Sequence, residues 1–439
     1  MYHIFMNTLD SIVSLCKRRG FIFPSSEIYG GFGGFWDRGP MGTALANNIK
    51  KLWWRRFVDE REDIYGLDAA IIMNPKTWEA SGHTGPGFAD PLRECKKCHH
   101  RFRGDDLKEN KCPDCGGELT EEKKFNILVK TFIGPIEDKS TQAYLRGETC
   151  QGIFVNFKNI LDVFHPGLPF GIAQIGKAFR NEITPGNFIF RSREFEQMEI
   201  EYFIAPDGDE QEYEKWKSEC LEFVKSLGIK NEGLRFYEHP KEKLSHYSKG
   251  TTDIEYNFPF GWGEIWGIAR RGDYDLTQHS KFSGQDLSYV NLVNGEKCLP
   301  WVVEPSVGVD RLMLSVLCDA YEEQVMDNGK KRVVLHLAPN IAPVQIAVFP
   351  LVSNKENIAA KAKEVYGLLR KKYVTLYDGV SNIGKRYRRQ DEIGTPYCVT
   401  IDYQTLEDGS VTVRDRDSMG QERVGIDRLN EYLTNIFNF

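Results

Sequence analysis

Charged and aromatic side chains are concentrated in the segment GKAFRNEITPGNFIFRSREFEQMEIEYF, which runs from Gly176 to Phe203. We expect a strand, a loop and a second strand. Successive side chains of a strand point to opposite faces, so one face of the second strand carries Phe195, Gln197, Glu199, Glu201 and Phe203. The opposite face carries Glu194, Glu196, Met198, Ile200 and Tyr202. A ring can stack on a base, and polar groups beside it can bind a cation.

Basic residues surround this hairpin. Arg180 and Glu182 end the first strand, and Arg191 and Arg193 lie in or near the loop. Arginine suits phosphate because its planar fork donates parallel hydrogen bonds and stays charged. The hairpin therefore predicts a ligand with a base, phosphates and an ammonium group. A solvated hairpin that carries only salt bridges is the alternative.

Four cysteines have the spacing of a metal site. The segment CKKCHHRFRGDDLKENKCPDC contains two CxxC pairs, formed by Cys95, Cys98, Cys112 and Cys115. Two such pairs can surround Zn²⁺ tetrahedrally, with no position left for water or substrate. We therefore predict a structural zinc site. Two disulfides in a secreted domain are the alternative, but we expect the remaining six cysteines to be reduced core residues of a cytoplasmic protein.

The elements that must position these residues fall into three parts. The first part, to about residue 90, contains a helix that starts near Pro40 and has a strong apolar face. The middle, to about residue 330, consists mostly of strands, with a helical stretch at about 209–228. In the last hundred residues, strands alternate with a helix at 355–372 and a final helix at 424–439. This alternation predicts a separate small α/β domain.

Composition excludes several classes of protein. The chain has 439 residues, is 41% hydrophobic and 27% charged, and has a formal net charge of -6. These values are typical of a globular protein with two or three domains, in which local basic patches would hold any polyanion. Polar and proline residues interrupt the apolar stretches, so we expect no membrane span, and no signal peptide is apparent.

One phosphate-loop pattern is misleading. GIAQIGKA, from Gly171 to Ala178, nearly matches GxxxxGK[ST], but its last position lacks the hydroxyl that binds magnesium. The interior of this segment is apolar. We therefore expect a strand that leads into the hairpin.

Three segments, in order, resemble the signature motifs of the class II aminoacyl-tRNA synthetases. GFWDRGPMGTALANNIKKLWW resembles motif 1, FRNE with FRSREFEQMEIEYF resembles motif 2, and EPSVGVDRLMLSVL resembles motif 3. The resemblance becomes more specific, to one family within this class, with three further segments: RGETCQGIFVNFKN, GWGEIWGIA and DYDLTQHSKFSG. Over nearly its whole length, the chain resembles the glycyl-tRNA synthetases of the homodimeric type.

The resemblance implies a fold and a set of domains. The fold is α+β, with an antiparallel catalytic sheet flanked by helices in residues 1–334. A zinc-ribbon-like insertion would occupy about 91–122, and a helical insertion about 205–250. Residues 335–439 would form an α/β anticodon-binding domain, and motif 1 would lie at a homodimer interface. ATP, glycine and tRNA(Gly) are the implied partners.

The resemblance also implies roles for individual residues. The ATP site would comprise Arg180, Asn181, Glu182, Phe190, Arg191, Phe195, Glu264, Ile265, Gly308 and Arg311. The amino-acid site would comprise Arg103, Glu148, Phe195, Gln197, Glu199, Glu304 and Ser306. Arg180 would bridge the α-phosphate and the glycine carboxylate, Arg311 would hold the outer phosphates, and both would be catalytic. Glu264 would help to hold Mg²⁺.

The chain departs from the family pattern at two places. Gly147 and Cys150 stand where the family commonly has proline and alanine, which loosens the turn that places Glu148. Arg271 and Gly272 lie in a second segment that differs from the usual asparagine, arginine and threonine arrangement. These departures affect local details of the expected glycine site.

The C-terminal segment GKRYRRQDEIGTP has a separate signal. It places Lys385, Arg386, Arg388 and Arg389 around an aromatic residue, Tyr387. Cations beside an aromatic ring suit unpaired bases and phosphates, as in an anticodon loop. We predict tRNA contact here, with a merely solvated loop as the alternative.

Two other functions remain open from the sequence. A non-catalytic synthetase-like subunit that binds nucleic acid could keep the same domains, but the retained arginines of motifs 2 and 3 argue against it. A class II synthetase for another small amino acid, such as serine or alanine, is the second alternative. The carboxylate-rich amino-acid site argues against this second alternative, because such a site suits a ligand with little more than an ammonium and a carboxylate group.

Overall fold

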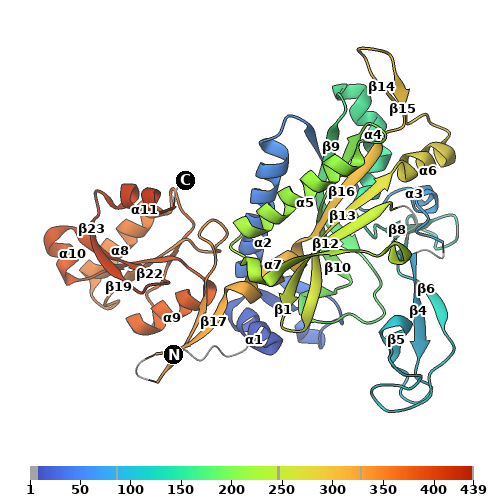
Figure 1. Cartoon of the computed structure of the whole chain (residues 1–439). Helices are drawn as coiled ribbons and strands as arrows, with labels where there is room; N and C mark the ends of the chain where they lie inside the picture. Colours follow the sequence, from blue (N-terminus) through green and yellow to red (C-terminus); the bar gives the residue numbers. More distant parts are fainter. Residues whose placement is uncertain (1–7, 86–87, 245–247, 327–328, 438–439) are drawn as a thin grey trace.

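A computed structural model describes residues 8–85, 88–244, 248–326 and 329–437. Two domains lie side by side, each around its own sheet (Figure 1). The helices are α1 (Leu9–Arg19), α2 (Pro40–Trp54), α3 (Pro75–Ala80), α4 (Cys150–Phe164), α5 (Asp209–Ser226), α6 (Tyr274–Ser283), α7 (Val309–Ala320), α8 (Glu356–Leu369), α9 (Ile383–Ile393), α10 (Tyr403–Asp408) and α11 (Leu429–Phe437).

The larger domain contains a seven-stranded sheet. Its order is β11–β12–β13–β16–β10–β9–β3, and every pairing is antiparallel except that of β3 with β9. The strands are β3 (Ile64–Leu67), β9 (Phe170–Phe179), β10 (Glu194–Ile204), β11 (Leu234–Glu238), β12 (Gly250–Phe258), β13 (Gly261–Gly272) and β16 (Trp301–Gly308). The predicted strand–loop–strand segment is β9 and β10, and GIAQIGKA lies within β9, as expected.

Helices pack on both faces of this sheet. Apolar residues of α1, α2, α5 and α7 form one core with Met198, Ile200 and Tyr202 of β10. The apolar face predicted for α2 is buried, as Leu45, Ile49 and Trp53 show. On the opposite face, α4 and α6 cover Phe203 at one end of β10 and leave the other end open. This open part of the sheet is where a ligand can bind.

Short strands form the connections of the larger domain. A three-stranded insertion projects away from the sheet (Figure 1), in the order β5 (Arg101–Arg103), β4 (Ala89–Glu94) and β6 (Lys123–Asn126). Four two-stranded units complete the list: β1 (Ile22–Pro24) with β2 (Trp36–Arg38), β7 (Val129–Phe132) with β8 (Gln142–Leu145), β14 (Tyr289–Val290) with β15 (Lys297–Cys298), and β17 (Tyr321–Val325) with β18 (Lys331–Leu335).

The C-terminal domain contains a five-stranded mixed sheet in the order β20–β19–β21–β22–β23. The strands are β19 (Ile346–Pro350), β20 (Thr375–Tyr377), β21 (Tyr397–Ile401), β22 (Ser410–Asp415) and β23 (Gln421–Gly425). Apolar residues of α8 and α11 pack on one face of this sheet. The predicted final helix began too early, because Val424 pairs with Val411 in β23. Residues 438–439 lie outside the described part of the chain.

The β17–β18 hairpin follows α7 and lies between the two domains (Figure 1). The predicted domain boundary near residue 334 falls at the end of this hairpin. The linker that follows also contacts the larger domain, because the Asn48 side chain donates to the carbonyl oxygens of Ile341 and Ala342 at 3.2 and 3.1 Å. Among the described residues, none of the helices has the length and apolar character needed to cross a membrane.

Candidate functional site

A cavity of about 350 Å³ opens on the uncovered face of the seven-stranded sheet. β10, β12, β13 and β16 contribute to its lining, together with the first turn of α7 and the segment between β9 and β10. Thirteen of the predicted ATP and amino-acid contacts line it: Glu148, Arg180, Glu182, Phe190, Arg191, Phe195, Gln197, Glu199, Glu264, Glu304, Ser306, Gly308 and Arg311. The structure thus brings together residues that lie up to 163 positions apart in the sequence.

Three predicted contacts do not line this cavity in the described part of the chain: Arg103, Asn181 and Ile265. Arg103 lies in the projecting insertion and pairs with Asp90 and Asp105 at 3.3 Å each. The side chain of Ile265 is 1% exposed and belongs to the core on the other face of the sheet. The register of β12 and β13 shifts next to Ile265, so a bulge lets both Glu264 and Gly267 face the cavity.

The two faces of β10 divide its charges as the alternation predicted. Phe195, Gln197 and Glu199 line the cavity, whereas Glu196 lies on the opposite face. There Glu196 accepts from Arg38 at 2.5 Å and from Lys50 at 2.8 Å. Arg38 also donates to Asp310 at 2.7 Å. These ion pairs connect the segments that resemble motifs 1, 2 and 3, so the charge on this face is structural.

Two arginines of the cavity lining, Arg180 and Arg311, are only partly paired. The Nε of Arg180 donates to the carbonyl of Gly147 at 2.9 Å, and its Nη2 lies 3.9 Å from Glu148. Its guanidinium carbon lies 5.4 Å from the ring centroid of Phe195. Arg311 donates to Glu264 at 2.8 Å and lies over the ring of Phe190. The side chains of Arg180 and Arg311 are 32% and 28% exposed, which leaves both accessible to an anion.

The cavity lining also contains a group of carboxylates. Burial and the nearby Glu148 raise the pKa of Glu199, and burial raises the pKa of Glu304 to about 8. Burial alone would also raise the pKa of Glu148, but His83, Arg271 and Arg180 lower it well below its usual value. Carboxylates that resist ionisation beside one another favour a cationic ligand, which would compensate their charge.

The turn that carries Glu148 is held firmly despite Gly147. Glu148 Oε1 lies 3.0 Å from His83 Nε2 and accepts from Cys150 Sγ at 2.8 Å and from Gln151 at 3.2 Å. A Cβ at Gly147 would lie 3.1 Å from atoms of Leu128 and Phe88, so the position is also crowded. Side chains around the turn therefore place Glu148.

Several residues of the site were not predicted from the sequence. Arg271 is buried and donates to both carboxylate oxygens of Asp275, at 2.8 and 3.0 Å. It also donates to Glu304 and thereby orients that carboxylate. Glu201 lies beyond Glu199 on the same face of β10 and is 0% exposed. Neither of its carboxylate oxygens has a hydrogen-bond partner among the described residues, and burial raises its pKa well above the usual value.

His239 and Asp253 also line the cavity, and neither was predicted as a site residue. Their side chains are 2.7 Å apart, and burial together with the nearby Glu264 raises the pKa of Asp253 to about 7. The alternation of β12 could have placed Asp253 on the cavity face. The contribution of His239 depends on the tertiary fold and left no signal in the sequence.

The four predicted zinc ligands lie together in the projecting insertion. The Sγ atoms of Cys95, Cys98, Cys112 and Cys115 all lie within 4.8 Å of one another. The Cys95–Cys115 and Cys98–Cys112 sulfur distances are 3.5 and 3.6 Å. Both are close to the sulfur spacing of about 3.8 Å that follows from Zn–S bonds of about 2.3 Å in a tetrahedron. All ten cysteines are free, so the disulfide alternative does not hold.

The C-terminal basic segment is a helix, α9, rather than a loop. Lys385 is exposed, and Arg388 is 37% exposed. Arg386 is 2% exposed and donates to the carbonyls of Gly379 and Ser381, so it cannot contact RNA on this surface. Arg389 pairs with Asp378 at 2.6 Å. The prediction of Arg386 as a tRNA contact was wrong because its guanidinium is used within the domain.

Comparisons with known proteins agree with this architecture. Residues 131–320 match the family model of the tRNA synthetase class II core domain (G, H, P, S and T). Residues 345–436 match the anticodon binding domain model. These two segments correspond to the larger sheet with its cavity and to the C-terminal domain.

Similar proteins extend over nearly the whole chain. Glycine--tRNA ligases from Alkaliphilus oremlandii and Acetivibrio thermocellus are 52% and 53% identical, over 98% of this chain and 99% of theirs. The glycine--tRNA ligase of Thermobifida fusca is 53% identical over 97% of both chains. Identity of this extent, with both domain models matched in order, shows that the chain belongs to the glycine--tRNA ligase family of class II aminoacyl-tRNA synthetases.

Proposed function

We propose that this chain attaches glycine to tRNA(Gly) in an ATP-dependent reaction that proceeds through glycyl-adenylate. The observation that carries this proposal is that one cavity brings together two partly exposed arginines, Arg180 and Arg311, and three carboxylates, Glu148, Glu199 and Glu304. The arginines match the phosphates of ATP in charge, and the carboxylates match the ammonium group of glycine. The family membership supports the same reaction.

In the proposed reaction, the carboxylate of glycine attacks the α-phosphorus of ATP, and pyrophosphate leaves. Arg180 bridges the α-phosphate and the carboxylate, and Phe195 stacks on the adenine, whose amino group binds Glu182. Arg191 and Arg311 hold the outer phosphates. The terminal ribose hydroxyl of tRNA then attacks the adenylate carbonyl, and AMP leaves. Charge neutralisation and positioning supply the rate, with no covalent protein intermediate.

Glycine selection would depend on the carboxylates of the cavity. Glu148, Glu199, Glu304 and Ser306 surround the ammonium group, and Arg271 orients Glu304. The site rejects larger amino acids because an added methyl group would overpack it, at a cost of roughly 1–3 kcal/mol or more. Exclusion of a larger rival in this way needs no separate editing site.

The carboxylates beside Arg311 fit a magnesium ion that arrives with ATP. Magnesium prefers oxygen ligands and takes one or two carboxylates together with substrate phosphates. Glu264 and Asp253 would supply these oxygens, and the raised pKa of Asp253 marks a place where a cation is favoured. When bound, the ion would neutralise charge on the phosphates.

A structural zinc ion fits the cysteine cluster of the insertion. Besides the tetrahedral spacing of the sulfur atoms, the backbone N–H groups of Lys97 and Cys98 donate to Sγ of Cys95 at 3.4 and 3.5 Å. This favours the thiolate that zinc requires. Asp106, in the same insertion, lies 3.8 Å from Arg191 of the cavity, so the folded insertion also borders the cavity.

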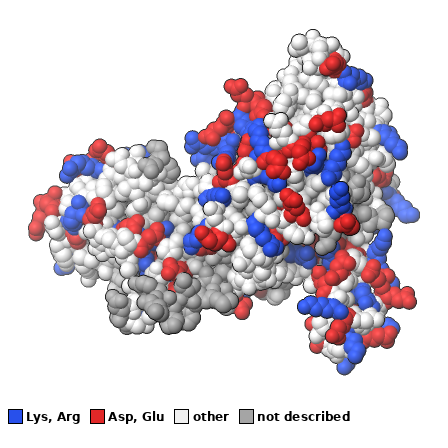
Figure 2. Space-filling model, viewed as in Figure 1, with Lys and Arg blue, Asp and Glu red and all other residues white. Residues whose placement is uncertain are grey.

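We propose a division of labour between residues 1–334, which would form the catalytic domain, and residues 335–439, which would bind the anticodon. In the first part, about 91–122 would be the zinc-binding insertion and about 205–250 the helical one. In the second, Lys385 and Arg388 of α9 would contact tRNA. The mixed charges on the face shown in Figure 2 agree with binding through such local patches.

A homodimer and a cytoplasmic location complete the proposal. Exposed apolar residues near the segment that resembles motif 1 support self-association, since Ile28, Tyr29 and Phe32 are 87%, 86% and 64% exposed. Apolar side chains of this size are typical of protein contacts. Sedimentation at several protein concentrations would test the dimer.

Amino-acid-dependent exchange between ATP and pyrophosphate tests the proposed function. Glycine should support exchange, whereas alanine and serine should be far weaker because their side chains overpack the ammonium site. Comparable exchange with serine or alanine would instead favour a synthetase for another small amino acid. Absence of exchange with all twenty amino acids, in a protein that still binds tRNA, would favour a non-catalytic subunit.

A further inference from the structure

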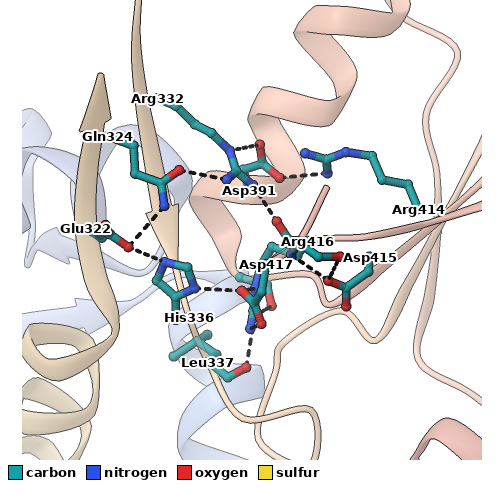
Figure 3. A network of polar contacts seen from close by, with 12 residues as sticks. Glu322, Gln324, Arg332, His336, Leu337, Asp391, Arg414, Asp415, Arg416 and Asp417 are labelled. Carbon is teal, nitrogen blue, oxygen red and sulfur yellow. Dashed lines mark hydrogen bonds and ion pairs between the residues drawn. The ribbon is translucent and has the colours of Figure 1, made fainter. Parts of the chain in front are cut away.

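A buried polar network joins the β17–β18 hairpin to the C-terminal domain (Figure 3). Arg332 of β18 and Asp391 of α9 have side chains that are 0% and 1% exposed. The Nε of Arg332 donates to Oδ2 of Asp391 at 2.8 Å. Arg414 of β22 donates to the other oxygen of Asp391 at 3.0 Å. One carboxylate of α9 thus binds cations from both sides of the domain junction.

The guanidinium of Arg332 reaches two further acceptors. Its Nη2 donates to the carbonyl of Arg416 at 2.6 Å, and its Nη1 donates to the side chain of Gln324 in β17 at 2.8 Å. Asp391, Arg416 and Gln324 therefore bind different edges of one rigid fork. Because the fork is planar, these bonds restrict rotation of the hairpin against α9 as well as separation.

Further bonds run in the reverse direction, from the C-terminal domain to the hairpin and linker. Arg416 is 4% exposed and donates to the carbonyl of Leu337 in the linker at 2.9 Å, while a second bond, to the carbonyl of Gly394 at 2.8 Å, ties it to the end of α9 within its own domain. His336 lies between Asp417 and Glu322, at 2.6 and 2.7 Å (Figure 3). The junction is therefore bonded from both domains.

We propose that the Arg332–Asp391 contact and its neighbours in this network hold α9 in one orientation relative to the catalytic cavity, so that Arg332 and Asp391 are positioning residues for tRNA charging. Lys385 and Arg388 lie on the same helix as Asp391, so the orientation of α9 determines where a bound tRNA presents its acceptor end. The inference rests on the proposed tRNA contact of α9.

The physical basis is the directionality of the bonds. A buried ion pair commonly adds little net stability over apolar residues of similar size, whereas it can specify one arrangement. Apolar side chains at the junction would allow the domains to slide by small amounts. A misplacement of about 1 Å at a reacting centre can lower a rate by about 10²-fold.

The Arg332→Met variant tests the proposal. This variant should fold, because Asp391 keeps its bond to Arg414 and does not become an unpaired buried anion. Glycine-dependent exchange between ATP and pyrophosphate should stay within about twofold of the parent value, since Arg332 is not among the residues that line the cavity. Charging of tRNA should lose about tenfold or more in kcat/KM.

Two matched variants separate orientation from general damage. Arg332→Lys keeps the charge but cannot reach three acceptors with a fork, so it should retain exchange and recover only part of the charging loss. Lys331→Met changes the neighbouring residue, whose side chain is 64% exposed, and should affect neither activity. If Arg332→Met does not fold, the Arg332→Lys variant carries the same test.

Small-angle X-ray scattering of the free protein gives a second readout that involves no RNA. The Arg332 variants should show a broader distribution of distances between the domains than the parent and Lys331→Met. A folded Arg332 variant with parental scattering and parental tRNA kcat/KM would overturn the proposal, as would equal losses of exchange and charging. Failure of the parent to charge tRNA(Gly) would instead refute the proposed function, while scattering would still test the orientation.

Discussion

The cavity and the domain junction both remove many charges from water, but they differ in how those charges are paired. At the junction, Arg332 and Asp391 have hydrogen bonds in several directions and are almost completely buried. On the cavity face of β10, Oε1 of Gln197 has no hydrogen-bond partner among the described residues, and neither do the oxygens of Glu201, which lies beyond the cavity lining. The pKa of Glu304 is raised to about 8 because burial opposes its charge.

This difference in pairing distinguishes charges that hold the fold together from charges that bind a ligand. A fully bonded buried network holds one arrangement of the chain, whereas an incompletely compensated one costs free energy until a ligand supplies the missing charges. The same strand shows both cases, since Glu196 is paired with Arg38 and Lys50, while neither carboxylate oxygen of Glu201 has a hydrogen-bond partner among the described residues. Incomplete pairing, rather than charge density, identifies the functional site.

The zinc cluster provides the largest expected effect. Its four sulfur atoms lie within 4.8 Å of one another and, like the cavity, need a cation for compensation. Parent protein should carry one zinc per chain, and Cys112→Ser should lose that ion and unfold the insertion, since structural zinc contributes directly to folding. Metal analysis by mass spectrometry measures this. Cys220→Ser, at a buried cysteine of α5, is the control, and full zinc in Cys112→Ser would exclude this ligand set.

Removal of a cavity carboxylate should have the next largest effect. Glu304→Gln deletes one charge that faces the glycine ammonium and should raise the KM for glycine by about 10- to 10²-fold, as expected for a lost charged hydrogen bond. Steady-state exchange kinetics would measure it. Glu194→Gln, at a 38% exposed residue of the same hairpin, should change the glycine KM little. Equal effects of both variants would mean that a position in the cavity lining does not distinguish Glu304 from Glu194.

The raised pKa of Glu304 predicts a pH dependence of glycine binding. Below pH 8, the free cavity holds a proton on this carboxyl group, which glycine must displace. The KM for glycine should therefore fall as pH rises from about 6.5 toward 8, by up to about tenfold per pH unit for one proton. The Glu304→Gln variant should show a flatter profile. A glycine KM that rises over this range in the parent would contradict the assigned proton.

The basic helix should show the smallest effect. Lys385→Ala with Arg388→Ala should raise the KM for tRNA a few-fold and reduce the salt dependence of tRNA binding, because exposed cations contribute through phosphate contacts. Filter binding at several salt concentrations would measure this. Lys361→Ala on α8 removes a cation that already pairs with Glu364 and is the control. An unchanged salt dependence in the double variant would remove α9 from the RNA-binding surface.

Sequence patterns predicted the site best where a single strand carries it. The alternation in β10 placed Phe195, Gln197 and Glu199 on one face, because period-two alternation is a local property. The contributions of Arg271 and His239 were missed, since each depends on partners that only the tertiary fold brings near. Ile265 was implied as an ATP contact by the family resemblance, but it is buried in the core on the other face of the sheet, as alternation from Glu264 would place it.

The C-terminal domain shows the same limit. The strands β19, β20 and β21 and the helix α8 were predicted from sequence patterns, whereas β22 and β23 were not. The run of arginines in α9 was predicted to contact tRNA, with a solvated loop as the alternative. The sequence pattern could not show that the guanidinium of Arg386 would be buried and would donate to backbone carbonyls. Nor could it show that Asp391 would accept a hydrogen bond from Arg332 of the β17–β18 hairpin. Charged residues carry little information about burial when their partners lie far away in the sequence.

Single-turnover formation of glycyl-adenylate, measured for the parent, Arg180→Ala and Arg332→Met, tests the central claim most directly. Arg180 is incompletely paired in the cavity, whereas Arg332 is fully bonded at the junction. We expect Arg180→Ala to lower the rate by about 10²–10³-fold, as for loss of one donor to developing charge. Arg332→Met should stay within about twofold of the parent. A parental rate in Arg180→Ala, or a comparable loss in both variants, would contradict the account.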